Sequence, residues 1–145
     1  RLWRYREGIS EAITPRTPYK HDLSVNIHQA PAFLKAVDQL VNRMASDAEV
    51  IWFGHIGDGN VHLNILKPID QPIESFKAAC EPLGDAIMGV VQEFGGSVSA
   101  EHGVGLLKKR FLHYARSPAE IDQIKVLKQA LDPAGVMNPG KILDL

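Results

Sequence analysis

The stretch GHIGDGNVHLN, residues 54–64, constrains the fold more than any other segment of this chain. It places Asp58 and Gly59 between two runs rich in β-branched and aromatic residues, 49–57 and 60–68. An Asp-Gly pair between two such runs is the strongest short-range signal for a β-hairpin. The segment therefore predicts two antiparallel strands joined by a two-residue turn.

A two-residue turn at Asp58-Gly59 sets His55 opposite His62. Directly opposed residues share a face of the sheet, with Cβ atoms about 4.5–5.5 Å apart. Asn64 continues that face because strand side chains alternate with a period of two. The apolar residues between them belong on the other face, toward the helices. We expect the polar face to be open to a ligand or to another domain.

Hydrophobic periodicity predicts further elements around the hairpin. The predicted elements are helices at 1–13, 30–48, 73–95, 106–115 and 118–132, a strand at 19–27, and a strand within 96–105 that runs into a glycine-rich loop. The central order β-α-β-β-α-β is that of the ferredoxin-like, split βαβ arrangement. We therefore predict one α+β domain over residues 1–145. It has a ferredoxin-like, four-stranded antiparallel sheet with helices on one face, plus C-terminal helices.

Composition excludes several classes of function. A net charge of −1 gives no electrostatic case for nucleic acid, and no apolar run is long enough to span a membrane. The single cysteine, Cys80, excludes an internal disulfide and fits a reducing compartment such as the cytoplasm; its helical apolar pattern predicts a buried side chain. The first residues lack both a signal-peptide pattern and an initiator Met, so we expect a fragment of a longer protein. Peripheral membrane attachment and a homodimer stay open.

The two hairpin histidines have a candidate third partner. Glu101 lies in SAEHGVG, at the end of another predicted strand, and completes a set of two histidines and one glutamate. This set is typical of catalytic Zn²⁺ with an open position, and its nitrogen and oxygen donors also suit Mn²⁺ or Fe²⁺. The neighbouring His102 can accept a proton near neutral pH. The alternative is that all four side chains are ordinary polar residues on a solvated surface.

Basic side chains are weaker candidates for binding residues. Arg6 and Lys20 suit a carboxylate ligand, although each is also explained as a solvated surface charge. The basic run 108–110 is interpreted as a solvated helix face or as a patch for a partner domain. The glycine-rich segments match neither phosphate-loop spacing nor G-x-G-x-x-G, so we reject nucleotide binding on that basis.

Four segments together resemble a known family. YKHDLSV, GHIGDGNVHLNI, SAEHGVGLLKKRFL and LDPAGVMNPGKIL resemble, in the same order, the C-terminal half of the FAD-linked 2-hydroxyacid dehydrogenases of the vanillyl-alcohol-oxidase superfamily. That group includes D-lactate dehydrogenase, the glycolate oxidase catalytic subunit and D-2-hydroxyglutarate dehydrogenase. The resemblance implies oxidation of a small D-2-hydroxy acid to the 2-oxo acid by hydride transfer to FAD. It also implies that FAD is bound by an N-terminal domain outside this chain, so we expect the chain to be inactive alone.

The resemblance also implies roles for individual residues. The implied roles are metal ligation, with Zn²⁺ or Mn²⁺, for His55, His62 and Glu101; removal of the hydroxyl proton for His102; substrate binding for Arg6, Ser10, Lys20 and Asn64; and approach to the flavin for Asn138. His21 departs from the family pattern, which has Tyr at that position.

Two other functions remain compatible with the same residues. One is a stand-alone, metal-dependent hydrolase that uses a metal-bound water. The other is a non-catalytic ferredoxin-like module that binds a small acid. The first predicts hydrolysis without flavin, and the second predicts binding that is insensitive to metal.

Overall fold

The computed structural model describes residues 2–55 and 57–145, which form an α+β fold as predicted. The strands are β1 (Tyr19–Ser24), β2 (Glu49–His55) and β3 (Asn60–Leu66). The α-helices are α1 (Trp3–Glu7), α2 (Ile9–Ile13), α3 (Ala30–Met44), α4 (Ile73–Glu93), α5 (Leu112–Ala115) and α6 (Pro118–Leu131). The short 3₁₀ turns are η1 (Thr14–Arg16), η2 (Ile27–Gln29) and η3 (Lys109–Phe111). Ile56, expected in the first hairpin strand, lies outside the described residues.

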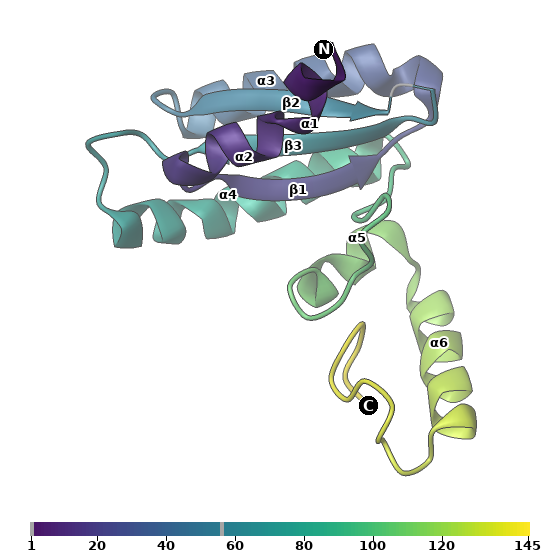
Figure 1. Ribbon diagram of the computed structural model, residues 1–145. Helices are drawn as coiled ribbons and strands as arrows, with labels where there is room; N and C mark the ends of the chain where they lie inside the picture. Colours follow the sequence, from purple (N-terminus) through teal and green to yellow (C-terminus); the bar gives the residue numbers. More distant parts are fainter. Residues whose placement is uncertain (1, 56) are drawn as a thin grey trace.

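The described strands form an antiparallel sheet in the order β1-β3-β2. Helices α3 and α4 cover one face, while α1 and α2 lie over the other (Figure 1). The prediction that the two helices of the ferredoxin-like unit pack on one face of the sheet is therefore confirmed, and α1 and α2 lie outside that unit. The predicted helix 1–13 is divided at Gly8, and η1 with Thr17 in a left-handed conformation (φ 50°) reverses the chain into β1. This reversal folds the N-terminal segment back over the polar face.

The predicted strand 96–105 is reduced to a single bridge, between Ser97 and Ser24, within the described part of the chain. That bridge lies beside β1, where the fourth strand of a ferredoxin-like sheet belongs. Beyond it, the backbone N–H groups of residues 100–102 all turn toward the Asp22 carboxylate. The N–H of Ala100 also reaches the Asp22 backbone carbonyl at 3.3 Å, but those of Glu101 and His102 bond the side chain, so the ladder with β1 does not continue and the segment forms a loop.

The core lies between the sheet and helices α3 and α4. Its fully buried members include Leu63 and Ile65 of β3, Phe33 and Val37 of α3, and Ile87 of α4. The alternation of apolar and polar residues along β3 therefore predicted the core face correctly. Cys80 is buried in α4, as expected, and burial raises the pKa of its thiol to about 11.

The predicted register of the hairpin is wrong by two residues. His55 pairs with Asn60, and Phe53 pairs with His62, so the loop is four residues long. A two-residue type I′ turn needs positive φ at both central positions, but of Asp58 and Gly59 only Gly59 has it (φ 75°). The carboxylate of Asp58 accepts the N–H of Asn60, and Gly59 O accepts the N–H of Val25 from the end of β1. A shift of two residues keeps both histidines on the same face.

The C-terminal segment departs from the body of the molecule (Figure 1). The expected helix at 118–132 is present as α6 and begins with a capping box between Ser117 and Glu120. The expected helix at 106–115 is mostly loop, with only η3 and α5 at its end. None of the residues of α6, all of which are described, is buried. No helix in the described part of the chain is long and apolar enough to cross a membrane.

Candidate active site

A pocket of about 600 Å³ lies on the polar face of the sheet, between the N-terminal helices and the loop after α4. Its lining includes Arg6 and Ser10 from α1 and α2, and Lys20, Phe53, His62 and Asn64 from the sheet. The loop contributes Glu101, His102 and residues 103–108. The expected open sheet face is therefore a pocket wall, and both His62 and Asn64 are buried.

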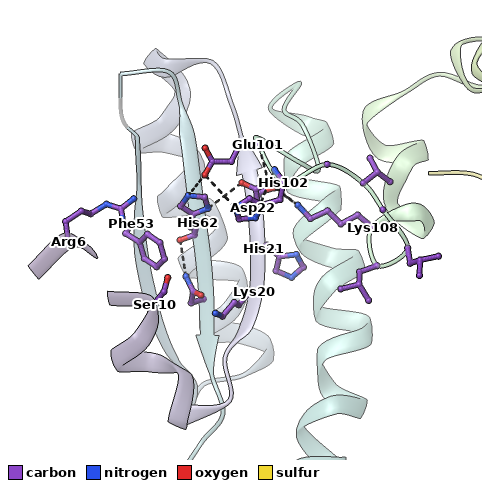
Figure 2. Close-up of a pocket in the computed structure, with 16 residues that line it drawn as sticks. Arg6, Ser10, Lys20, His21, Asp22, Phe53, His62, Glu101, His102 and Lys108 are labelled. Carbon is purple, nitrogen blue, oxygen red and sulfur yellow. Dashed lines mark hydrogen bonds and ion pairs between the residues drawn. The ribbon is translucent and has the colours of Figure 1, made fainter. Parts of the chain in front are cut away.

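Two acids and two histidines form one cluster in this pocket, which we call the acid–histidine cluster: Asp22, His62, Glu101 and His102 (Figure 2). One potential ligand atom from each residue lies within 4.8 Å of those of the other three. His62 Nε2 lies 3.2 Å from Glu101 Oε1, and its Nδ1 lies 3.4 Å from Asp22 Oδ1. The His102 ring stacks on the His62 ring, with centroids 5.5 Å apart. Nitrogen and carboxylate donors so close together are a set suited to a divalent cation.

Burial favours a neutral His62 within the cluster. Burial lowers the pKa of His62, against the opposing effect of the Asp22 and Glu101 carboxylates. A neutral imidazole is the form that ligates metal ions, and the hydrogen bond at one ring nitrogen selects the nitrogen that is free to ligate. Nδ1 of His62 faces Asp22 and Nε2 faces Glu101, so a proton on Nδ1 would leave Nε2 available to ligate a metal ion.

The expected metal-ligand set agrees with this cluster only in part. His62 and Glu101 belong to it, whereas His55 does not, although His55 Nδ1 lies 3.8 Å from Glu101 Oε2. The four-residue loop explains the difference, because His55 is one step diagonal to His62 instead of directly opposite. Its ring centroid is 6.1 Å from that of His62.

Sequence reasoning missed Asp22 and misread Lys108. Asp22 is 4% exposed, and its Oδ2 accepts hydrogen bonds from the loop that carries Glu101 and His102. Lys108 was expected on a solvated helix face, but its side chain is only 16% exposed and its Nζ lies 3.3 Å from Asp22 Oδ2. For Asp22, the sequence offered one signal of a role in the site: it is a charged residue in the middle of a strand, two positions from Lys20. Alternation places it on the polar face, but the sequence does not reveal its partners.

The expected substrate-binding residues all line the pocket. Lys20 pairs with Asn64 across β1 and β3, so both side chains share the polar face. The Arg6 guanidinium lies over the Phe53 ring, 5.0 Å from its centroid. Asn138 differs, because it lies in the C-terminal tail, with φ 46°, and outside the pocket lining.

His21 faces the opposite side of β1 from Asp22. It is buried between Tyr19 and Phe111, with ring centroids 4.4 and 6.4 Å away. Burial, followed by the positive charges of Lys108 and Arg110, lowers the pKa of His21 to about 4. The imidazole is therefore neutral in the folded chain at physiological pH.

We expect the His21 imidazole to make the chain less stable in mild acid. The unfolded chain binds a proton near the ordinary histidine value of 6.5, but the folded chain does so only near 4. Stability is thus fully present above pH 6.5 and is lost as the pH falls toward 4, by about 3 kcal/mol. Urea unfolding at pH 7 and pH 4 measures this loss. His21→Phe should remove most of it, whereas an equal loss in the variant would assign the acid sensitivity to other groups.

Comparison with known proteins shows the family to which the chain belongs. The chain belongs to the family described as FAD linked oxidases, C-terminal domain, which matches residues 1–142. The resemblance drawn from the sequence motifs is therefore confirmed. The chain is 52% identical, over 97% of its length, to a D-2-hydroxyglutarate dehydrogenase of Stutzerimonas stutzeri, and 48% identical, over 99%, to one of Xanthomonas citri. It is also 35% identical, over 98%, to the mitochondrial D-2-hydroxyglutarate dehydrogenase of Arabidopsis thaliana.

The match covers only part of each relative. The chain spans 30% of the length of both bacterial relatives and 24% of the plant protein. Most of each relative therefore has no counterpart in this chain.

Proposed function

We propose that this chain is the substrate-side domain of an FAD-linked dehydrogenase that oxidises D-2-hydroxyglutarate to the 2-oxo acid. The observation that carries the proposal is a single pocket with two chemically different parts. Glu101 and His102 lie in one part, and Arg6, Ser10 and Lys20 in the other, with His62 and Phe53 between them (Figure 2). A dicarboxylic hydroxy acid has the same division between its reacting carbon and its distal carboxylate.

In the proposed reaction, His102 accepts the proton of the substrate hydroxyl. Its side chain is 66% exposed and lines the pocket, so a substrate can reach the ring. Loss of this proton leaves the Cα hydride to depart with its electron pair, and a C=O bond forms. FAD, when bound by the rest of the protein, supplies the hydride acceptor that no side chain provides.

Charged and polar side chains hold the substrate in this proposal. Arg6 and Lys20 bind the distal carboxylate, Arg6 through a paired contact and Lys20 as a point charge. Ser10 and the buried Asn64 provide hydrogen bonds beside them. Fixing the substrate at two ends orients the Cα–H bond and lowers the entropic part of the barrier.

The donor chemistry of the cluster fits a divalent cation, Zn²⁺ or Mn²⁺. His62 Nε2 and Glu101 would hold it, and His55 is the third proposed ligand because its ring lies beside Glu101, with Nδ1 3.8 Å from Glu101 Oε2 and 3.3 Å from Asn60 Nδ2. Asp22 is less suited, since its Oδ2 already accepts several hydrogen bonds and its Oδ1 faces His62. A cation at this point would act as a Lewis acid and lower the pKa of the substrate hydroxyl.

The proposal assigns residues 1–145 to a C-terminal domain whose partner is the FAD-binding part of the same protein. Large apolar side chains exposed on α6 and the tail support this arrangement: Leu127, Leu131, Val136 and Met137. An exposed apolar surface of this kind usually marks an interface. Asn138 follows Met137 directly and would approach the flavin from this surface.

The test uses the full-length protein with bound FAD, under anaerobic conditions. We expect D-2-hydroxyglutarate to bleach the oxidised flavin faster than D-lactate or glycolate does. Arg6→Gln should raise KM for D-2-hydroxyglutarate by about 10–100-fold, the loss expected for about 1.5–3 kcal/mol of a charge-assisted hydrogen bond. Arg4→Gln, in the same helix but outside the pocket lining, is the matched control.

The alternatives predict other results. Ester or amide hydrolysis without flavin would favour the metal-dependent hydrolase. Tight binding of hydroxy acids with no flavin bleaching would favour the non-catalytic module, and either result would refute the dehydrogenase proposal.

A further inference from the structure

Asp22 lies at the junction between the sheet and the loop after α4. It is paired in register with His62 across β1 and β3, and both side chains are buried on the polar face. The loop that carries Glu101 and His102 passes beside it. Its Oδ2 is already engaged by protein groups, so we assign Asp22 no direct chemical role.

One oxygen of Asp22 accepts several hydrogen bonds from the loop after α4. Oδ2 accepts the N–H groups of Ala100, Glu101 and His102, at 3.1, 3.1 and 3.0 Å, and the hydroxyl of Ser99 at 3.2 Å. Successive N–H groups that converge on one anion form a concave binding site for it. Here the anion is part of the protein, so the backbone that bears Glu101 and His102 is fixed to β1.

The other oxygen of Asp22 faces His62. Oδ1 lies 3.4 Å from His62 Nδ1 and has no hydrogen-bond partner among the described residues. A carboxylate at Nδ1 fixes the tautomer and the ring orientation of a ligating histidine. His62 Nε2 is thereby directed to Glu101 Oε1.

Lys108 supplies the matching charge. Its Nζ donates to Asp22 Oδ2, to the Asp22 backbone carbonyl at 3.0 Å and to Ser99 Oγ at 3.2 Å. These contacts and the loop N–H groups outweigh the burial of Asp22, which by itself favours the neutral acid, and lower its pKa to about 2. The carboxylate is therefore charged whenever the protein is folded near neutral pH.

We propose that Asp22 is a positioning residue that uses its two oxygens for two tasks, fixing the Glu101–His102 loop with one and orienting His62 with the other. This proposal rests on the proposed function, which gives Glu101, His102 and His62 their roles. Asn at position 22 performs only one task, because its amide has a single acceptor oxygen. If that oxygen takes the loop, its NH₂ group faces His62 Nδ1 and favours the tautomer whose Nε2 carries the proton.

The test compares Asp22→Asn with the unchanged full-length, FAD-loaded protein. We expect zinc affinity, measured by competition with a chelator in the absence of substrate, to fall by about 10–100-fold. The kcat for D-2-hydroxyglutarate should fall by a similar factor, with KM changed less than about twofold, since Arg6 and Lys20 are untouched. Amide hydrogen exchange at residues 100–102 should become faster, because three N–H groups lose a charged acceptor.

Asp38→Asn is the matched control. Asp38 accepts the indole N–H of Trp52 at 2.8 Å and lies on α3, away from the pocket, so the variant removes a similar charge without touching the cluster. It should leave zinc affinity, kcat and exchange at 100–102 unchanged. If Asp22→Asn fails to fold, Lys108→Gln keeps the proposal testable, with losses in the same three readouts.

The outcomes separate this proposal from the proposed function. A wild-type protein that binds zinc and reduces its flavin, beside an Asp22→Asn variant that does both equally well and only melts at a lower temperature, would show a merely structural Asp22. A wild-type protein that does neither would refute the proposed function. Exchange at residues 100–102 would still decide whether Asp22 holds the loop, and unchanged exchange would overturn the proposal.

Discussion

His102→Gln in the full-length flavoprotein is expected to lower kcat for D-2-hydroxyglutarate by about 10²–10⁴-fold, the usual contribution of a positioned general base. Gln keeps a polar side chain but cannot accept the hydroxyl proton near neutral pH. The His102 ring makes only long contacts with its acidic neighbours, 3.8 Å to Asp22 and 3.7 Å to Glu101. We therefore expect the variant to fold normally and to bind the substrate with a similar KM.

His28→Gln is the matched control for this prediction. His28 is exposed in η2 and lies outside the pocket lining, so its loss should leave kcat unchanged. Anaerobic flavin reduction measures the chemical step directly. If the His102→Gln protein reduces its flavin at the wild-type rate, His102 is not the general base. Glu101 would then be the next candidate for that role.

Phe33→Ala should produce the largest loss of stability, about 3–5 kcal/mol in the free energy of unfolding. Phe33 is fully buried in α3 and meets Phe94 and Trp52 edge to face, with ring centroids 5.6 and 6.4 Å away. Truncation loses the transfer free energy of the ring and leaves a cavity between α3, α4 and the sheet. Urea unfolding of the chain measures the change.

Ile69→Ala provides the comparison for Phe33→Ala. Ile69 is exposed in the loop before α4, and such surface substitutions usually change stability by less than about 0.5 kcal/mol. A loss for Phe33→Ala as small as that would mean that the core between α3 and the sheet is not closely packed.

The arrangement of the pocket shows how the N-terminal helices contribute to the proposed reaction centre. Arg6 and Ser10 reach the pocket only because α1 and α2 fold back over the polar face. The same fold buries His62 and Asn64, which a bare sheet face would leave in water. Removal of water would strengthen the charge interactions with the proposed acidic substrate.

The sequence by itself determined the local elements and the sides of the sheet. Alternation along 60–66 separated buried Leu63 and Ile65 from polar His62 and Asn64, because a strand has a period of two whatever its neighbours are. Helical periodicity and capping signals located α3, α4 and α6 within a few residues. The motifs around Asp58-Gly59 and Glu101-His102 were also sufficient to indicate the family, which the match over residues 1–142 confirms.

Only the tertiary structure decided the hairpin register and the partners of Asp22. The hairpin loop is hydrogen-bonded through Gly59 to Val25, and the loop after α4 is hydrogen-bonded to an aspartate 80 residues before His102. Neither contact produces a periodic pattern in the sequence. Each involves a backbone group, which every residue has, and a partner that is distant in the chain. Local patterns therefore predicted which side chains face the site, while long-range hydrogen bonds determined how they meet.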